Sequence, residues 1–250
     1  MRQILPPRPG DLSDTELAGL YAYPDGARTV RANMVMSADG AASVSGRSGG
    51  LSSPADRRVF ALLRGLADVI LAGAGTVRAE RYKPVRQHEI WPGLRAGRAA
   101  TPPIAVVTRR LDLDPDDALF AEAPPEARTI VLTSGLAPAA RRAAFAGRAD
   151  VVVTGAERVD LEAAIGALAS RGYRRILCEG GPHLLAELTT AGLLGELCLT
   201  VSPLLAGPGA GRISQAMGLA GDGGTRPLRL AHVLAEDGVL LSRYTAALDG

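Results

Sequence analysis

The stretch Cys-Glu-Gly-Gly-Pro-His-Leu-Leu at residues 178–185 combines residue types suited to binding a phosphorylated ligand. It follows the apolar pair Ile176-Leu177, so the pattern predicts a strand, a glycine turn and the start of a helix. Adjacent glycines let the backbone turn sharply and approach a ligand closely. The free N–H groups and the positive dipole end of the following helix favour phosphate. A tight turn that binds nothing is the alternative, because a lone Gly-Gly pair is a weak signal.

A second strand end that carries glycines lies upstream. The apolar run Ala67–Ala72 is followed at once by Gly73-Ala74-Gly75-Thr76-Val77. Arg78 stands three residues after Gly75, so the GxGxxG fingerprint of dinucleotide-binding folds is absent. The two strand ends together predict one cofactor held across the edge of a sheet.

Bulk properties exclude several classes of function. The chain has 250 residues, 47% of them hydrophobic, and its net charge of +2 forms no basic stripe for nucleic acid. No apolar run approaches the roughly 20 residues that span a bilayer, and the start of the chain has no signal-peptide pattern. The two cysteines form no CxxC pair. We therefore expect a reduced, cytoplasmic protein without nucleic-acid or membrane partners.

Apolar runs and capping residues predict an alternation of strands and helices from residue 29 onward. Ser53 and Pro54 mark the start of one helix, and Asp160 marks the start of another. The expected strands of this part are Thr29–Ser37, Ala67–Ala72, Pro103–Thr108, Thr129–Thr133, Asp150–Val153 and Arg175–Cys178. This alternation is typical of an α/β fold with a mostly parallel sheet.

The last quarter of the chain changes character. Glu196–Ser202 is a further expected strand, and Glu236-Asp237-Gly238 is a hairpin signal between Leu228–Leu234 and Val239–Thr245. We expect this hairpin to close the sheet with an antiparallel edge.

The sequence also predicts the domain organisation and the long connecting loops. Residues 1–27 are predicted to be a proline-rich, initially extended N-terminal arm with a short helix capped at Ser13, and residues 28–250 to be one domain. The long polar connections Tyr82–Thr101 and 206–226 are predicted to be lids or binding loops, with disorder as the alternative.

In their order and spacing, these motifs resemble the reductase half of the riboflavin-biosynthesis deaminase/reductase, a pyrimidine reductase with a dihydrofolate-reductase-like fold. The likeness runs from about Arg31 to Tyr244. Its anchors are Ser37-Ala38-Asp39-Gly40, Leu62-Leu63-Arg64, Ala67–Leu71, Gly73–Val77, Glu179-Gly180-Gly181, and Glu196-Leu197 leading to Ser202–Gly207. The resemblance implies a homodimer that transfers hydride from NADPH to a ribosylaminopyrimidine, 5-amino-6-ribosylaminouracil phosphate.

The companion deaminase activity is excluded by the residues themselves. Zinc deaminases need a His-x-Glu and a Pro-Cys-x-x-Cys pattern. The three histidines His88, His183 and His232 belong to neither pattern, so no metal site is expected.

The resemblance assigns cofactor-binding residues to both glycine motifs. Thr76 matches a position that contacts the cofactor, and Gly73 and Gly75 shape the strand end beside it. The loop that wraps the diphosphate is matched by Gly180, Gly181, Pro182, His183 and Leu184. Thr108 and Arg109 are candidates for the adenosine 2′-phosphate, because a guanidinium can bind phosphate in a bidentate manner. An ordinary exposed arginine is the alternative at position 109.

Substrate residues are assigned in the same way. Asp39 is the candidate to hydrogen-bond the pyrimidine or to deliver a proton, with a turn-forming Asp-Gly as the alternative. Ser48, Arg64 and Glu179 match positions near the substrate. Arg64 and Arg86 are candidates for its phosphate, although Arg64 could instead be a favourable charge at a helix end and Glu179 a helix cap.

The chain departs from the family pattern at three positions around the expected substrate pocket. Asn33 replaces a lysine and would line this pocket, Gly50 replaces a tryptophan, and Ala38 replaces a leucine. The hydride donor is therefore better supported than the acceptor. The alternatives are a reductase of dihydrofolate or another pteridine, a catalytically degenerate NADPH-binding sensor, and a transferase or sugar-nucleotide enzyme.

Overall fold

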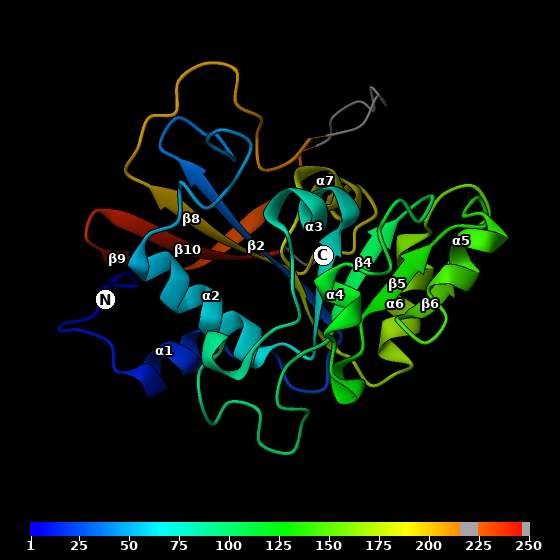
Figure 1. The fold of residues 1–250 in the computed structure, drawn as a ribbon. Coiled ribbons are helices and arrows are strands. Elements are labelled where there is room, and N and C mark those ends of the chain that lie inside the picture. Colours follow the sequence, from blue (N-terminus) through cyan, green and yellow to red (C-terminus); the bar gives the residue numbers. More distant parts are fainter. Residues whose placement is uncertain (216–224, 247–250) are drawn as a thin grey trace.

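Short runs rich in Val, Ile, Leu and Ala form the strands of one ten-stranded sheet (Figure 1). The computed structural model describes residues 1–215 and 225–246. The strands are β1 (Arg2–Leu5), β2 (Thr29–Ser37), β3 (Val69–Gly73), β4 (Ile104–Thr108), β5 (Ile130–Thr133), β6 (Asp150–Val153), β7 (Arg175–Cys178), β8 (Glu196–Ser202), β9 (Leu228–Glu236) and β10 (Val239–Ala246).

The strand order across the sheet is β1-β9-β10-β8-β2-β7-β3-β4-β5-β6. Every neighbouring pair from β8 to β6 is parallel, whereas β10 pairs antiparallel with β8 and β9, and β1 pairs antiparallel with β9. Because β7 inserts between β2 and β3, the carboxyl ends of these three strands meet at the centre of one sheet edge. Crevices of this kind are where α/β sheets bind ligands.

Helices cover the sheet and begin at the expected caps. Ser13 and Ser53 accept backbone N–H bonds at the starts of α1 and α2, and Asp160 does so at α6. The helices are α1 (Asp14–Leu20), α2 (Pro54–Leu66), α3 (Ala74–Glu80), α4 (Ala118–Ala121), α5 (Ala139–Ala144), α6 (Leu161–Ala169) and α7 (Pro182–Thr190), with 3₁₀ turns at η1 (Gln87–Glu89) and η2 (Pro125–Ala127). No helix in the described ranges is long and apolar enough to cross a membrane.

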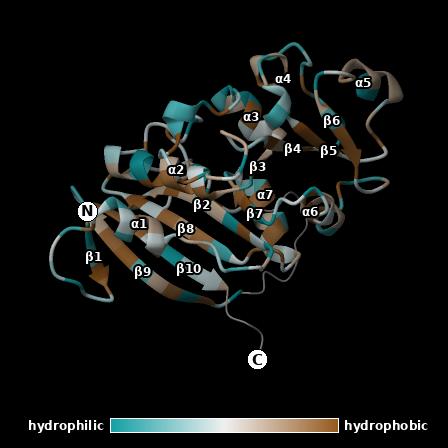
Figure 2. Ribbon diagram, turned by 90° about the horizontal axis from the view of Figure 1, so that it is seen from below, coloured by the Kyte–Doolittle hydropathy of each residue, from teal (hydrophilic) through white to brown (hydrophobic). Residues whose placement is uncertain are grey.

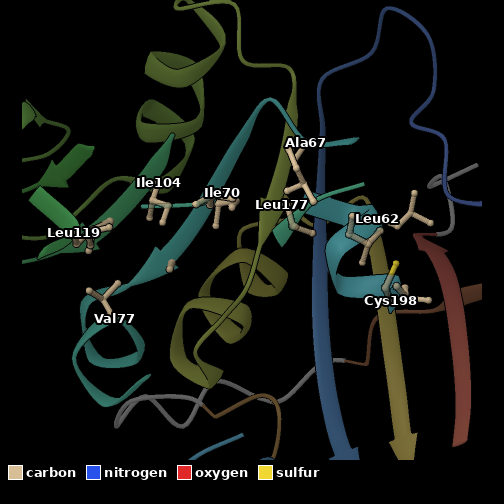
Figure 3. Close-up of a cluster of buried hydrophobic side chains, with 14 of the residues drawn as sticks. Leu62, Ala67, Ile70, Val77, Ile104, Leu119, Leu177 and Cys198 are labelled. Carbon is tan, nitrogen blue, oxygen red and sulfur yellow. The ribbon is translucent and has the colours of Figure 1, made fainter. Parts of the chain in front are cut away.

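The core is divided between the two faces of the sheet. Successive side chains of a strand point to opposite faces, so Ile70 of β3 joins the cluster under α2, while Val69 and Leu71 join the cluster under α6 and α7. Figure 3 shows the first cluster, with Leu62 of α2 and Leu177 of β7 on the same side as Ile70.

The predicted fold class is confirmed: one mostly parallel α/β sheet with flanking helices and an antiparallel C-terminal edge. The ends of the observed strands lie within a few residues of the predicted ends. For example, β3 begins at Val69, two residues later than expected. The hairpin also forms, with Asp237 and Gly238 at positive φ as a tight two-residue turn requires.

The N-terminal segment takes part in this fold. The predicted helix after Ser13 forms with its capping box, and β1 adds a strand to the sheet that the sequence analysis did not predict. Leu17 and Tyr21 are fully buried in the core. The boundary at residue 27 stays a prediction.

The two long connections differ in what the structure describes. The segment after Tyr82 packs against the end of α2, where Arg98 donates hydrogen bonds to the carbonyl oxygens of Gly65 and Leu66. This contact satisfies carbonyl groups that a helix end leaves open. The connection 206–226 lies partly outside the described residues.

Candidate active site

The two glycine motifs meet at the carboxyl ends of β3 and β7. The Gly73 N–H donates to the Gly180 carbonyl oxygen at 2.8 Å, and the Gly180–Gly181 peptide is cis. A Cβ on Gly181 would lie 2.5 Å from Oγ1 of Thr76, so this position has no room for a side chain. Gly180 has φ +93°, a conformation that only glycine adopts readily. The predicted pairing of the two strand ends is therefore present.

Two helices start beside this contact. Gly181 precedes α7, and Gly73 precedes α3, and neither helix start has a side-chain cap. Figure 1 shows α3 and α7 side by side at this edge. Pro182 has no N–H, so the backbone N–H groups of His183 and Leu184 remain in the first turn of α7. Bare glycine backbone at a helix start fits the diphosphate of a dinucleotide.

Other predicted cofactor residues are distributed around the same edge. Thr108 is buried at the end of β4, and the exposed Arg109 donates from Nε to the Glu157 carbonyl oxygen at 2.8 Å. Nδ1 of His183 lies 2.8 Å from the Gln215 carbonyl oxygen. The Leu184 side chain packs in the core, so only its backbone is available to a ligand.

A buried ion pair follows directly from the end of β7. Nε and Nη2 of Arg64, in the last turn of α2, donate to the two carboxylate oxygens of Glu179 at 2.7 and 2.9 Å. The Tyr82 hydroxyl donates to the same carboxylate at 2.7 Å. Burial alone would lower the pKa of Arg64, but the Glu179 carboxylate raises it above its ordinary value. Burial and the Glu179 charge also raise the pKa of Tyr82.

The predicted phosphate candidate Arg86 lies on a loop held near this pair. Its backbone N–H donates to Oε2 of Glu89 at 3.1 Å, and the same oxygen is 3.7 Å from Nη1 of Arg64. The Arg86 side chain is exposed. Arg64 is therefore occupied by carboxylates, whereas Arg86 points its charge at solvent beside them.

Asp39 is engaged in a loop contact. Its carboxylate accepts hydrogen bonds from the Ser37 hydroxyl and from the N–H groups of Ala206 and Gly207, at 3.1 and 2.9 Å for the two backbone bonds. These bonds, that of Ser37 foremost, lower the pKa of Asp39. The side chain is thus an ionised anchor that ties the turn after β2 to the loop after β8.

Ser48 and Asn33, the other predicted substrate residues, lie on different elements. Ser48 donates from its N–H and its hydroxyl to Glu80 of α3, at 2.8 and 3.0 Å. Asn33 is half-buried on β2, in register with Cys198 of β8. Its side chain is on the α2 face, because Ala32 and Met34 pack on the opposite one.

Sequence reasoning missed Tyr82 and Glu80, which complete the Arg64–Glu179 pair and fix Ser48. Tyr82 is 97 positions from Glu179. No spacing rule connects residues at that separation, and Tyr82 stood at the start of a segment that the sequence analysis treated as a long polar connection. In the described ranges, no cluster of three or more His, Cys, Asp or Glu side chains offers a metal site.

Comparisons with known proteins agree with this geometry. The family model described as the RibD C-terminal domain matches residues 28–239. A 2,5-diamino-6-ribosylamino-4(3H)-pyrimidinone 5′-phosphate reductase of Methanothermobacter thermautotrophicus is 31% identical over 176 residues, covering 70% of this chain and 77% of that protein. A protein of the same name from Archaeoglobus fulgidus is 31% identical over 159 residues, covering 63% of this chain and 71% of that protein.

Solved structures show the same architecture. The crystal structure of a pyrimidine reductase-like protein from Corynebacterium diphtheriae superposes with a TM-score of 0.78 at 28% identity, covering 89% of this chain and 93% of that chain. This chain and the Corynebacterium diphtheriae protein therefore share the fold that brings the strand ends described above together.

Proposed function

Because the chain belongs to the RibD C-terminal domain family, we propose that it is an NADPH-dependent reductase that acts on a ribosylaminopyrimidine phosphate. The names of its two archaeal relatives support this substrate class. The observation that carries the proposal is the direct contact of the two glycine motifs beside the Arg64–Glu179 pair. Glu179 directly follows β7, and Gly180 comes next. The backbone proposed to bind the dinucleotide is therefore adjacent to the buried Arg64–Glu179 pair.

NADPH, when bound, supplies the hydride, and the protein's part is to bind, orient and exclude water. Gly180 and Gly181 present bare backbone, and the first N–H groups of α7 bind the diphosphate. Thr76 borders the same cradle. Arg109 is the proposed partner of the 2′-phosphate, since within residues 1–215 and 225–246 its guanidinium donates only from Nε, to Glu157.

On the substrate side, we assign different tasks to the two predicted arginines. Arg86 binds the substrate phosphate, because its side chain is exposed beside the site. Arg64 fixes the Glu179 carboxylate, which then accepts hydrogen bonds from the amino groups of the pyrimidine. Ser48 and Asn33 line the same pocket.

The ionised Asp39 fits a positioning role better than proton delivery. A carboxylate whose pKa is lowered holds few protons at neutral pH, and three donors already point at this one. We propose that Asp39 holds the two loops that border the substrate, and that an ordered water delivers the proton that accompanies hydride transfer.

The test is NADPH oxidation by the purified protein, after NADPH binding has been measured by fluorescence. The ribosylaminopyrimidine phosphate and dihydrofolate are offered separately. Turnover of the first alone supports the proposal, and turnover of dihydrofolate alone would move the substrate to the pteridines. Binding without turnover would favour a sensor, and absence of NADPH binding would overturn the proposal.

Arg86→Gln sharpens the substrate assignment. We expect this variant to raise KM for the phosphorylated pyrimidine about tenfold or more while NADPH affinity stays unchanged, because one charge-assisted contact is worth at least 1.4 kcal/mol. The matched control is Arg57→Gln, an exposed arginine in the first turn of α2. Equal KM values for the two variants would remove Arg86 from the site.

We also propose that the protein acts as a homodimer in the cytoplasm. Both cysteines are free and buried, as in proteins of reducing compartments. Figure 2 shows α1 and α2 on one side of β8, β9 and β10, with no helix among the described residues on the other side. Two cross-strand pairs have their side chains on this face: Leu240 with Val201, and Leu230 with Tyr244. Leu240 and Leu230 are exposed. An apolar sheet face of this kind suits a second copy of the chain.

A further inference from the structure

A cavity of about 500 Å³ lies at the opposite edge of the sheet from the glycine motifs. It opens at the amino ends of β3 and β7, where Asp68 precedes β3 and Arg175 begins β7. β3 runs from this cavity to Gly73, and at about 3.3 Å per residue the two edges are roughly 16 Å apart. We call the cavity the amino-edge pocket. Its size is within the range of small-molecule sites.

Arginine dominates the walls of the amino-edge pocket. Five arginines line it together with three acidic residues, Asp25, Asp68 and Glu126. The arginines are Arg95, Arg98, Arg171, Arg174 and Arg175. Asp25 and Glu126 are exposed, so Asp68 is the one buried acidic group facing these arginines.

Asp68 is already saturated by its neighbours. Oδ1 accepts from Arg98 at 3.0 Å and from Nε of Arg175 at 3.2 Å, and Oδ2 accepts the backbone N–H groups of Arg174 and Arg175. One carboxylate therefore serves two guanidinium groups. The remaining positive charge of the pocket has no buried counter-ion among the described residues.

Three guanidinium groups retain open donors. Nε of Arg175 binds Asp68, and neither terminal nitrogen of Arg175 has a hydrogen-bond partner in the described part of the chain. Arg174 and Arg171 use one terminal nitrogen each, on the carbonyl oxygens of Gly26 and Ala167. Forked donors on several arginines around one cavity are the arrangement that binds phosphate in a bidentate manner.

Two further observations concern the residues around the pocket. Tyr23 is part of its wall, and the buried Tyr23 hydroxyl has no hydrogen-bond partner in the described residues. Burial and the neighbouring Arg98 lower the pKa of Arg95 to about 10, so the positive charge is held at a cost that an anion would offset.

We propose that the amino-edge pocket binds the phosphate group of a small phosphorylated metabolite. Arg171, Arg174 and Arg175 supply the donors, and Tyr173 on the same wall offers a ring for the rest of the molecule. This site is separate from the reductase site and does not depend on the proposed reaction. A ligand there lies at the start of the two strands whose other ends carry Gly73 and Glu179.

The test is isothermal titration of the protein with pyrophosphate, inorganic phosphate and adenosine 5′-monophosphate. Three proteins are compared: the native chain, R171Q/R174Q, and R8Q/R148Q. The control pair loses the same charge from exposed arginines outside the pocket, each in a surface ion pair. We expect R171Q/R174Q to weaken pyrophosphate binding at least tenfold and R8Q/R148Q to leave it within twofold.

Equal affinities for all three proteins, or no binding to the native chain, would overturn the proposal. A ligand held only at the glycine motifs gives equal affinities, so the two sites are distinguished. For the binding that R171Q/R174Q weakens, a higher affinity for adenosine 5′-monophosphate than for inorganic phosphate supports a phosphorylated metabolite, whereas the reverse order contradicts it in favour of free phosphate. Urea denaturation checks that both double variants remain folded, as their exposed positions lead us to expect.

Discussion

At the scale of single residues, Gly181 is a position beside the proposed cofactor site that has no room for a side chain. A methyl group there would meet Oγ1 of Thr76 at 2.5 Å. We expect Gly181→Ala to lower the free energy of unfolding by about 1–3 kcal/mol, as overpacking does, and to weaken NADPH binding at least tenfold. Urea denaturation and fluorescence titration measure the two effects.

Gly166→Ala is the matched control for this substitution. Gly166 lies within α6, and a Cβ there has no heavy atom within 4 Å. Alanine in a helix is more stable than glycine by roughly 0.5–1 kcal/mol, so this variant is expected to gain stability and to keep its NADPH affinity. In a Thr76→Ala background, the stability cost of Gly181→Ala is expected to shrink. An undiminished cost would show that the Thr76 contact is not its source.

The Arg64–Glu179 pair gives a second residue-scale prediction. Glu179→Gln removes the buried carboxylate that Arg64 binds and leaves Arg64 only the more exposed Glu89, so we expect a loss of about 3–5 kcal/mol in the free energy of unfolding. Tyr82→Phe removes one donor to the same carboxylate and is expected to cost about 1 kcal/mol. Comparable losses for the two variants in urea would contradict this account of the pair.

His232 predicts a pH dependence of stability. Its ring is buried against Tyr21, with ring centroids 4.8 Å apart, and Nε2 has no partner among the described residues. Burial, followed by the charges of Arg243 and Arg31, lowers the pKa of His232 to about 4 from an ordinary 6.5. Below pH 6.5 the unfolded chain binds a proton that the folded chain does not. The free energy of unfolding therefore falls between pH 6.5 and 4, by about 3 kcal/mol in all.

His232→Phe keeps an aromatic ring and removes the titrating group. We expect urea midpoints of this variant to depend less on pH between 4 and 6.5 than those of the native chain. His88→Gln is the control, because His88 is exposed on η1 and its loss is expected to leave the native slope intact. A slope that is unchanged by His232→Phe would refute the assignment.

At the scale of elements, local signals predicted most of the fold. Caps at Ser13, Ser53 and Asp160 and the apolar runs fixed helix starts and strands because those signals lie within a few residues of their effect. β1 was missed because four residues before a Pro-Pro pair carry no such signal, and its pairing partner β9 is more than 200 positions away. α3 was missed because its seven residues begin with Ala-Gly-Thr.

The glycine motifs were recognisable for the same local reason, whereas their surroundings were not. Glycines at a strand end indicate that another backbone segment or a ligand approaches closely. The parallel sheet then brings the two glycine motifs together. Apart from Ser37, two positions from Asp39, the hydrogen-bond partners of Asp39 and Glu179 come from loops and helices 97 to 168 positions away, where only the folded chain sets the contact. Composition and spacing therefore predicted that the two glycine motifs lie together, whereas the contacts of Asp39 and Glu179 emerged only from the structure.

The N-terminal segment gives the element-scale prediction. Leu17 of α1 is fully buried in the core cluster under α2, although the segment read as an arm in the sequence. We expect Leu17→Ala to cost about 2–5 kcal/mol in the free energy of unfolding. Leu205→Ala is the control, since Leu205 is 82% exposed and its loss is expected to change stability little. A small effect of Leu17→Ala would mean that α1 adds nothing to the stability of the domain.

At the scale of the whole molecule, the sheet has two unlike halves. The parallel half has helices on both faces, which its buried strands require. The antiparallel half is covered by α1 and α2 on one face and by no described helix on the other (Figure 2). The hydrophobic clusters on the two faces of the sheet are therefore covered by helices to different extents in the antiparallel half. The face of β9 and β10 that carries the exposed Leu230 and Leu240 is where we place the second subunit.

L230D/L240D tests this placement. Both leucines are exposed on that face, so two carboxylates there are tolerated by the folded monomer but not by an apolar interface. We expect light scattering after size exclusion to give a dimer mass for the native chain and a monomer mass for the double variant. Val153→Asp is the control, because Val153 is 49% exposed on β6, at the other end of the sheet. A monomeric native chain would refute the dimer, and a dimeric double variant would place the interface elsewhere.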